Sequence, residues 1–134
     1  MKSIIILTFV LLNCISFSKA NILDSSDTSF VKERISISGI EKGLIYKEVL
    51  LASKGLAFRD SIAKHFKIVG FKLSMYIKNK DLIELDTNSG ELSHGMIDVI
   101  KSAPPGTKLF FEYIRCIDNA GVNRAVLPTQ FTLK

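Results

Sequence analysis

The chain has 134 residues with 18 basic and 13 acidic side chains, so its formal net charge at pH 7 is +5. The two signs are interspersed, and so mild an excess does not predict a nucleic-acid or membrane surface as partner. The length suits one domain with a hydrophobic core, and two cysteines, Cys14 and Cys116, are too few for a disulfide-rich fold.

The first 20 residues have the pattern of a secretory signal peptide. Lys2 provides the positive start, residues 4–12 form an apolar run, and small residues at Ser18 and Ala20 precede the expected cleavage before Asn21. The run is too short for a transmembrane helix, which needs about 20 residues. We therefore expect a periplasmic or secreted protein.

An alternative N-terminal processing is also open. Residues 11–14 loosely resemble a bacterial lipobox, in which a lipidated Cys14 would become the first mature residue. The product would be a membrane-anchored lipoprotein, and the membrane would be a partner only through that lipid. Cleavage after Ala20 would instead leave Cys116 as the one cysteine, so no intrachain disulfide is expected in that form.

After the signal peptide we expect a flexible leader at 21–33 and one β domain at 34–134. The alternation of Ile35 and Ile37 with serines predicts a short strand that ends at Gly39. Residues 46–53 fit two helical turns, with Gly55 placed to end them.

The first long strand is predicted at 66–77. Its apolar alternation shifts by one residue at Gly70, and an extra residue at a glycine indicates a β-bulge. A turn at 79–81 leads to a short strand at 82–85. A helix follows at 93–102, with Ser93 as N-cap and the sequence Pro-Pro-Gly at 104–106 as its end.

The last third of the chain predicts a β-hairpin. An aromatic-rich strand at 107–117 contains Cys116, which we expect to be buried. In the connection at 118–121, Gly121 suits a left-handed conformation. The return strand at 122–127 is interrupted by Pro128, which marks a bulge or an edge, and residues 129–133 form the final strand.

These elements predict a mainly β, sandwich-like fold with one or two short helices. An α+β fold, with an antiparallel sheet and a packed helix, is the alternative. Phe110 and Phe111 must point to opposite faces of their strand, so one of them should face a second layer or a partner. The final strand, 129–133, is the first candidate for an exposed sheet edge that pairs with a partner chain.

The C-terminal half resembles the C-terminal domain of the GldM family, gliding-motility and type IX secretion proteins of Bacteroidota. The resemblance runs from about Ile35 to the end of the chain and is strongest from Phe66 onward. The residues that show it are Gly106, Phe110, Phe111, Ile114, Gly121, Arg124, Leu127 and Pro128. It implies an immunoglobulin-like β-sandwich that works through protein contacts in the periplasm, in association with the secretion or gliding machinery.

No reactive constellation stands out in the sequence. His65 and His94 have no ligand partner at a metal-binding spacing, and Ser93 is better explained as a helix cap than as a nucleophile. We therefore expect no catalytic residue, no metal and no cofactor, and a non-enzymatic module that binds a protein and not nucleic acid. The alternative is a small secreted enzyme or ligand-binding protein, which would show an apolar pocket with a buried carboxylate or histidine.

Overall fold

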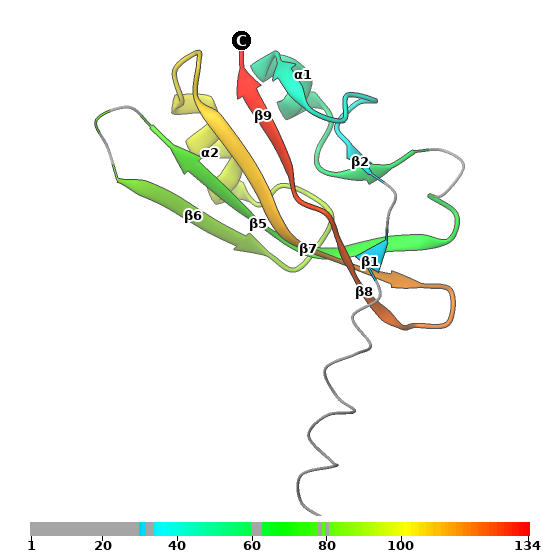
Figure 1. Cartoon of the computed structure of the whole chain (residues 1–134). Coiled ribbons are helices and arrows are strands. Elements are labelled where there is room, and N and C mark those ends of the chain that lie inside the picture. Colours follow the sequence, from blue (N-terminus) through cyan, green and yellow to red (C-terminus); the bar gives the residue numbers. More distant parts are fainter. Residues whose placement is uncertain (1–29, 32–33, 60–62, 78, 80) are drawn as a thin grey trace, which may run out of the picture.

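The computed structural model describes residues 30–31, 34–59, 63–77, 79 and 81–134 (Figure 1). The predicted signal peptide, with the cleavage site at Ala20 and Asn21 and the alternative lipidation site at Cys14, lies outside the described residues. Within the described part of the chain, no helix has the length and apolar character needed to cross a membrane.

Strands dominate the described residues, with two short helices among them. The helices are α1 (Lys47–Ala52) and α2 (His94–Ser102). The strands are β1 (Phe30–Val31), β2 (Ile35–Ser36), β3 (Gly43–Ile45), β4 (Ala57–Phe58), β5 (Phe66–Tyr76), β6 (Leu82–Thr87), β7 (Lys108–Asp118), β8 (Asn123–Val126) and β9 (Thr129–Leu133).

One large sheet contains seven of these strands in the order β1-β8-β7-β5-β6, with β9 paired to both β7 and β3. The 11-residue strand β7 pairs with β9 along its first half and with β8 along its second half. The interruption between β8 and β9 is at Leu127 and Pro128, as the missing N–H of proline predicts. β2 and β4 form a separate two-stranded sheet.

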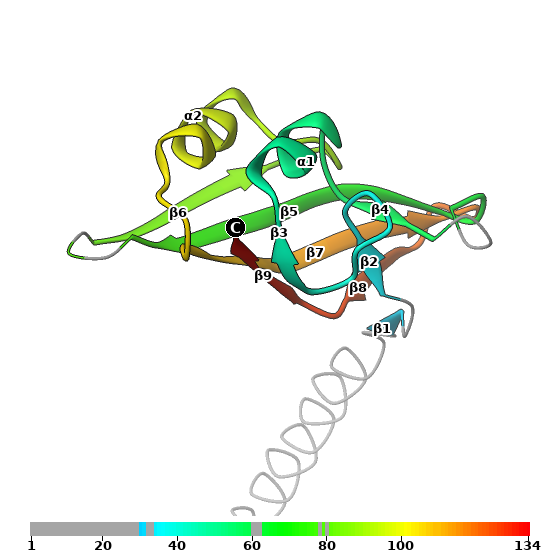
Figure 2. The same cartoon turned by 90° about the horizontal axis from the view of Figure 1, so that it is seen from above.

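Both helices lie over one face of the large sheet (Figures 1 and 2). Leu50 of α1, together with Met96 and Ile100 of α2, has no exposed surface and belongs to the core between the layers. Ile35 and Phe58 of the two-stranded sheet join the same core. The predicted mainly β, sandwich-like fold with one or two short helices is confirmed, and the packed helices of the alternative are present in its second layer.

Local signals in the sequence explain the ends of α2. The Ser93 hydroxyl accepts a hydrogen bond from the Met96 amide at 3.3 Å, which confirms the predicted N-cap. Beyond the helix, Gly106 has a φ of +88° and its amide donates to the Leu133 carbonyl at 2.7 Å. The glycine therefore joins the end of the helix segment to the last strand.

The predicted bulge in β5 is also confirmed. The register between β5 and β7 shifts on either side of Gly70. A Cβ at this position would lie 2.9 Å from the carbonyl oxygen of Thr87 in β6. Gly70 is therefore required both by the extra residue and by the close approach of the neighbouring strand.

Two other predictions are wrong. The helix expected over residues 46–53 is present as α1, but Gly55 does not terminate it, because α1 ends at Ala52 and Lys54 takes the positive φ of 65° beyond it. Gly55 is buried instead, where a Cβ would overlap the backbone of Gly90 and Glu91. It is needed for a long-range contact between backbones, which no local pattern reveals.

The final strand is not an edge. β9 pairs with β7 on one side and with β3 on the other, so its backbone hydrogen bonds go to two neighbouring strands. β3 has only three residues, which is too few for its sequence to predict this pairing. In addition, β1 lies inside the expected leader at 21–33 and pairs in parallel with β8.

Candidate interaction surface

The face of the large sheet that points away from the helices has no second layer among the described residues (Figure 2). We call it the open face. In β5, β6 and β7 it is formed by the residues that alternate with the core positions and pair across the strands: Lys72, Ser74, Tyr76, Leu82, Glu84, Asp86, Lys108, Phe110 and Glu112. Tyr113, which has no cross-strand partner, joins this face through its contact with Lys72.

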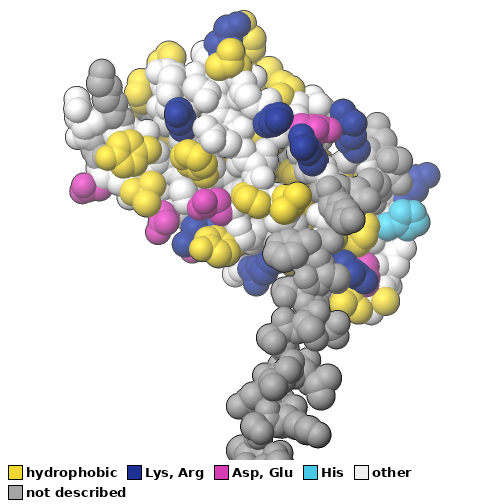
Figure 3. All heavy atoms as spheres, viewed as in Figure 1, with side chains coloured by type: hydrophobic (Ala, Val, Ile, Leu, Met, Phe, Trp, Pro, Cys, Tyr) yellow, Lys and Arg dark blue, Asp and Glu magenta, His cyan; other side chains and the backbone are white. Residues whose placement is uncertain are grey.

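Large side chains are exposed on the open face. The exposed fractions are 63% for Tyr76, 51% for Leu82 and 74% for Tyr113. In Figure 3, hydrophobic side chains gather over this part of the sheet between acidic and basic ones. Exposed hydrophobic groups with polar neighbours, on a rigid sheet, are typical of a protein interaction site.

Polar contacts hold the side chains of the open face in place. Lys72 Nζ lies 3.9 Å from Glu84 Oε2 and 5.3 Å from the centre of the Tyr113 ring. The Ser74 hydroxyl, which is almost fully covered by its neighbours, donates to Glu112 Oε2 at 3.1 Å. A surface ordered in this way loses less side-chain entropy when a partner binds.

Tyr113 was not predicted as a site residue. It has a φ of 49° within β7, next to Glu112, and both side chains lie on the open face. The backbone change here lets the strand return to its core phase at the buried Ile114. The only sequence signal was the loss of strict alternation between Phe111 and Ile114, which is weak in a strand this rich in apolar residues.

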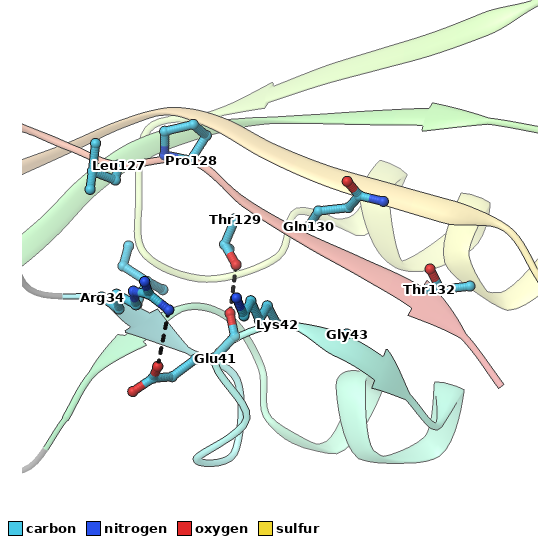
Figure 4. Close-up of a pocket in the computed structure, with 10 residues that line it drawn as sticks. Arg34, Glu41, Lys42, Gly43, Leu127, Pro128, Thr129, Gln130 and Thr132 are labelled. Carbon is cyan, nitrogen blue, oxygen red and sulfur yellow. Dashed lines mark hydrogen bonds and ion pairs between the residues drawn. The ribbon is translucent and has the colours of Figure 1, made fainter.

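A groove of about 560 Å³ lies beside the open face, where β3 and the segment before it meet the turn from β8 to β9 (Figure 4). Leu127 and Pro128 line one wall, and Arg34, Glu41 and Lys42 the other. The Thr129 hydroxyl donates to the Glu41 carbonyl oxygen at 2.6 Å and ties the two walls together.

The carboxylate in this groove is already paired. Glu41 Oε1 lies 3.1 Å from Arg59 Nη2, and Oε2 lies 3.8 Å from Arg34 Nη1. Both carboxylate oxygens of Glu41 are therefore engaged by guanidinium groups, and 25% of this side chain is exposed. The groove therefore does not match the apolar pocket with a buried carboxylate that an enzyme or ligand carrier would require.

The residues with reactive side chains come from separate elements. His65 precedes β5, and its Nδ1 lies 3.3 Å from Asn119 Nδ2, whereas His94 is exposed at the start of α2. Cys116 is fully buried within β7, as predicted, and burial raises the pKa of its thiol despite the opposing effect of Arg124. Within the described ranges, no group of three or more His, Cys, Asp or Glu residues could hold a metal ion.

The hairpin residues that resemble the GldM family are structural. Gly121 has a φ of +77°, as predicted. The Asp118 carboxylate accepts hydrogen bonds from the amides of Ala120 and Val122 at 2.9 and 3.0 Å and from Arg124 Nε at 3.0 Å. The amide of Val122 and the side chain of Arg124 lower the pKa of Asp118. Asp118 was not predicted, although an aspartate that opens such a turn is a recognisable signal.

The two phenylalanines in the resemblance have different positions. Phe111 is fully buried in the core, and Phe110 is half-buried on the open face.

Comparison with models of protein families and with curated proteins finds no match for this chain. The likeness to the GldM family therefore rests on the sequence motifs alone.

Proposed function

We propose that this chain is an exported, non-enzymatic module that binds another protein through the open face. Its location would be the periplasm or the extracellular space, or a membrane surface if Cys14 is lipidated. The likeness to the C-terminal domain of GldM supports a place beside secretion or gliding machinery. The observation on which the proposal depends most is the exposed group of Tyr76, Leu82 and Tyr113, on a sheet face that no second layer of the described residues covers.

The chemistry of this surface suits protein recognition. Tyrosine offers a large contact area and a hydroxyl at low cost in side-chain entropy, and it is enriched among residues that dominate binding energy. The surrounding Lys72, Glu84 and Glu112 provide charged groups of both signs, which favour one orientation of a partner. Strand β5 holds Lys72 and Tyr76 between two paired neighbours, β6 and β7.

Site-specific photo-crosslinking in the source cells tests the proposal. Benzoylphenylalanine at Tyr76 or Tyr113 is expected to give a covalent adduct with a defined partner, and the same group at Val122 in the hairpin turn is expected to give none. Val122 is a suitable control because its side chain is 49% exposed and lies in the turn between β7 and β8.

A double variant separates the proposal from the enzyme alternative. His65→Ala with His94→Ala removes both histidines, and the adducts at Tyr113 are expected to persist. The opposite result would be an open face that gives no adduct and a folded double variant that loses a measurable activity of the wild-type protein. It would contradict the proposal of a binding module and support an enzyme.

A further inference from the structure

The outer edge of β6 is the longest strand edge without a neighbour in the described part of the sheet. β6 has six residues and pairs with β5 along one side only. It contains no proline, so its backbone can offer both donors and acceptors to another strand. Figure 1 shows β6 at the border of the sheet, away from β7, β8 and β9.

Acidic residues are concentrated at this border. Residues 81–100, which include β6 and α2 up to Ile100, contain no lysine or arginine in a chain with 18 of them, and Lys101 follows in the last turn of α2. The same 20 residues contain five acidic side chains, which are Asp81, Glu84, Asp86, Glu91 and Asp98. α2 lies against this strand, since a Cβ at Gly95 would be 4.0 Å from Leu85 Cδ1. The fold therefore gathers one sign of charge at one edge of a basic protein.

The two sides of β6 differ in chemistry. Glu84 and Asp86 lie on the open face, whereas Ile83 and Leu85 lie on the helix side, half-buried against the core. Among the described residues, the side chain of Asp86 has no ion-pair or hydrogen-bond partner. The carboxylate of Glu84 has only one, Lys72, whose Nζ lies 3.9 Å from Glu84 Oε2. A strand added to this edge would meet acidic groups on one face and aliphatic groups on the other.

A second copy of the chain does not fit this edge. If two β6 strands paired antiparallel with matching faces, registers centred on Glu84 or Leu85 would use most of the strand. The first places Glu84 opposite itself and the second places it opposite Asp86. Like charges directly opposite each other destabilise a strand pair.

We propose that the β6 edge binds an extended segment of a partner protein in which aliphatic residues alternate with lysine or arginine. The segment adds one strand to the sheet through backbone hydrogen bonds. Its basic side chains lie beside Glu84 and Asp86, and its aliphatic side chains extend the apolar strip formed by Ile83 and Leu85. This inference rests on the proposed function and names the partner chemistry for one border of that surface.

The test uses a blocked, fluorescent heptapeptide that alternates lysine and valine, with binding measured by anisotropy at low salt. Asp86→Lys is expected to weaken binding at least about tenfold, since a nearby charge of the wrong sign opposes the basic peptide. Glu48→Lys on α1 makes the same change of charge far along the chain and is expected to have little effect. If Asp86→Lys does not fold, Asp86→Asn serves as the second variant, and it is expected to weaken peptide binding by a smaller factor.

Backbone pairing is tested by two methylated forms of the peptide. One has N-methyl groups on all valines and the other on all lysines, so each blocks a different edge of the extended peptide. An added strand uses one edge, so one form is expected to lose binding and the other to keep it. Equal binding of both forms would mean attraction by charge alone and would overturn the proposal.

Two further outcomes would also overturn it. Failure of the unmodified peptide to bind would mean that Glu84 and Asp86 only protect the edge against self-association. Preference for a peptide that alternates glutamate and valine would contradict the charge argument. If either result occurs while Tyr76 or Tyr113 still gives adducts, the proposed function remains intact. If the peptide binds but neither tyrosine gives an adduct, the proposed role of the open face is contradicted instead.

Discussion

The two faces of the large sheet are made by the same strands, but they have different environments. Phe111 on the core face has no exposed surface, and its ring lies 5.7 Å from Phe71 and 5.9 Å from Phe131. Its neighbour Phe110 is half-buried on the open face beside Ser74 and Gln130. The difference shows that alternation divides a strand between two faces, but a face becomes core only where another layer covers it.

The largest expected effect comes from truncating each of these two rings. Phe111→Ala should lower the free energy of unfolding by about 3–5 kcal/mol, because it leaves a cavity among packed rings. Phe110→Ala should cost less than about 1.5 kcal/mol, because part of its surface is already exposed. Urea denaturation followed by circular dichroism measures both, and similar losses in the two variants would show that the open face is covered.

A second comparison uses the thiol on the core face. Cys116 should react with a thiol reagent about a hundredfold more slowly in the folded protein than in urea, because the reactive thiolate forms only when the strand opens. Burial also raises the pKa of this thiol and so lowers its thiolate fraction at neutral pH. Rapid labelling of the native protein would mean that β7 opens easily and that its core face is not sealed.

The hairpin turn belongs to neither face and tests backbone conformation alone. Gly121→Val should cost about 1–3 kcal/mol, because a β-branched residue is strained at a φ of +77°. A Cβ there would meet no atom within 4 Å, so steric overlap does not contribute. The thermal midpoints of Gly121→Val and Val122→Ala give the comparison, and an unchanged midpoint for Gly121→Val would place the turn elsewhere.

The smallest expected effect is the dependence of stability on pH at Asp118. Hydrogen bonds from Val122 and Arg124 hold the pKa of this carboxyl below its unfolded value near 3.9. The stabilisation is therefore present above that value and is lost as pH falls through the lower, folded pKa. Urea titrations between pH 2 and 7 should show a stability gap between the wild type and Asp118→Asn that closes only at the acidic end, and a gap that stays constant would contradict this.

Features that depend on a few adjacent residues could be predicted. The Ser93 cap, the bulge at Gly70, the positive φ of Gly121 and the burial of Cys116 all follow from local sequence and are confirmed. The general kind of site could also be proposed, since Phe110 and Phe111 had to face opposite ways. The open face itself could not be located, because the covering of a face by α1 and α2 depends on where distant segments pack.

Features that depend on pairing between distant segments could not be predicted. β9 looked like a terminal edge because nothing in its sequence specifies β3 as a second neighbour. Gly55 looked like a helix end because its contact with the Gly90 backbone joins segments 35 residues apart. The acidic edge was missed for the same reason, since the charges of β6 and α2 matter together only once the helix lies against the strand.

The sequence alone determined the long strands β5 and β7, the hairpin turn at Gly121 and the start of α2 in this protein, and which side chains share a strand face. These properties depend on alternation, on capping and on backbone freedom at single residues, all of which act over a few positions. Within the part of the chain that the structure describes, the tertiary structure alone decided that β9 is internal, that β6 is a free edge and that the face with Tyr76 and Tyr113 stays open. Those outcomes depend on which apolar surfaces bury one another, and burial is a property of the whole chain, to which every segment contributes.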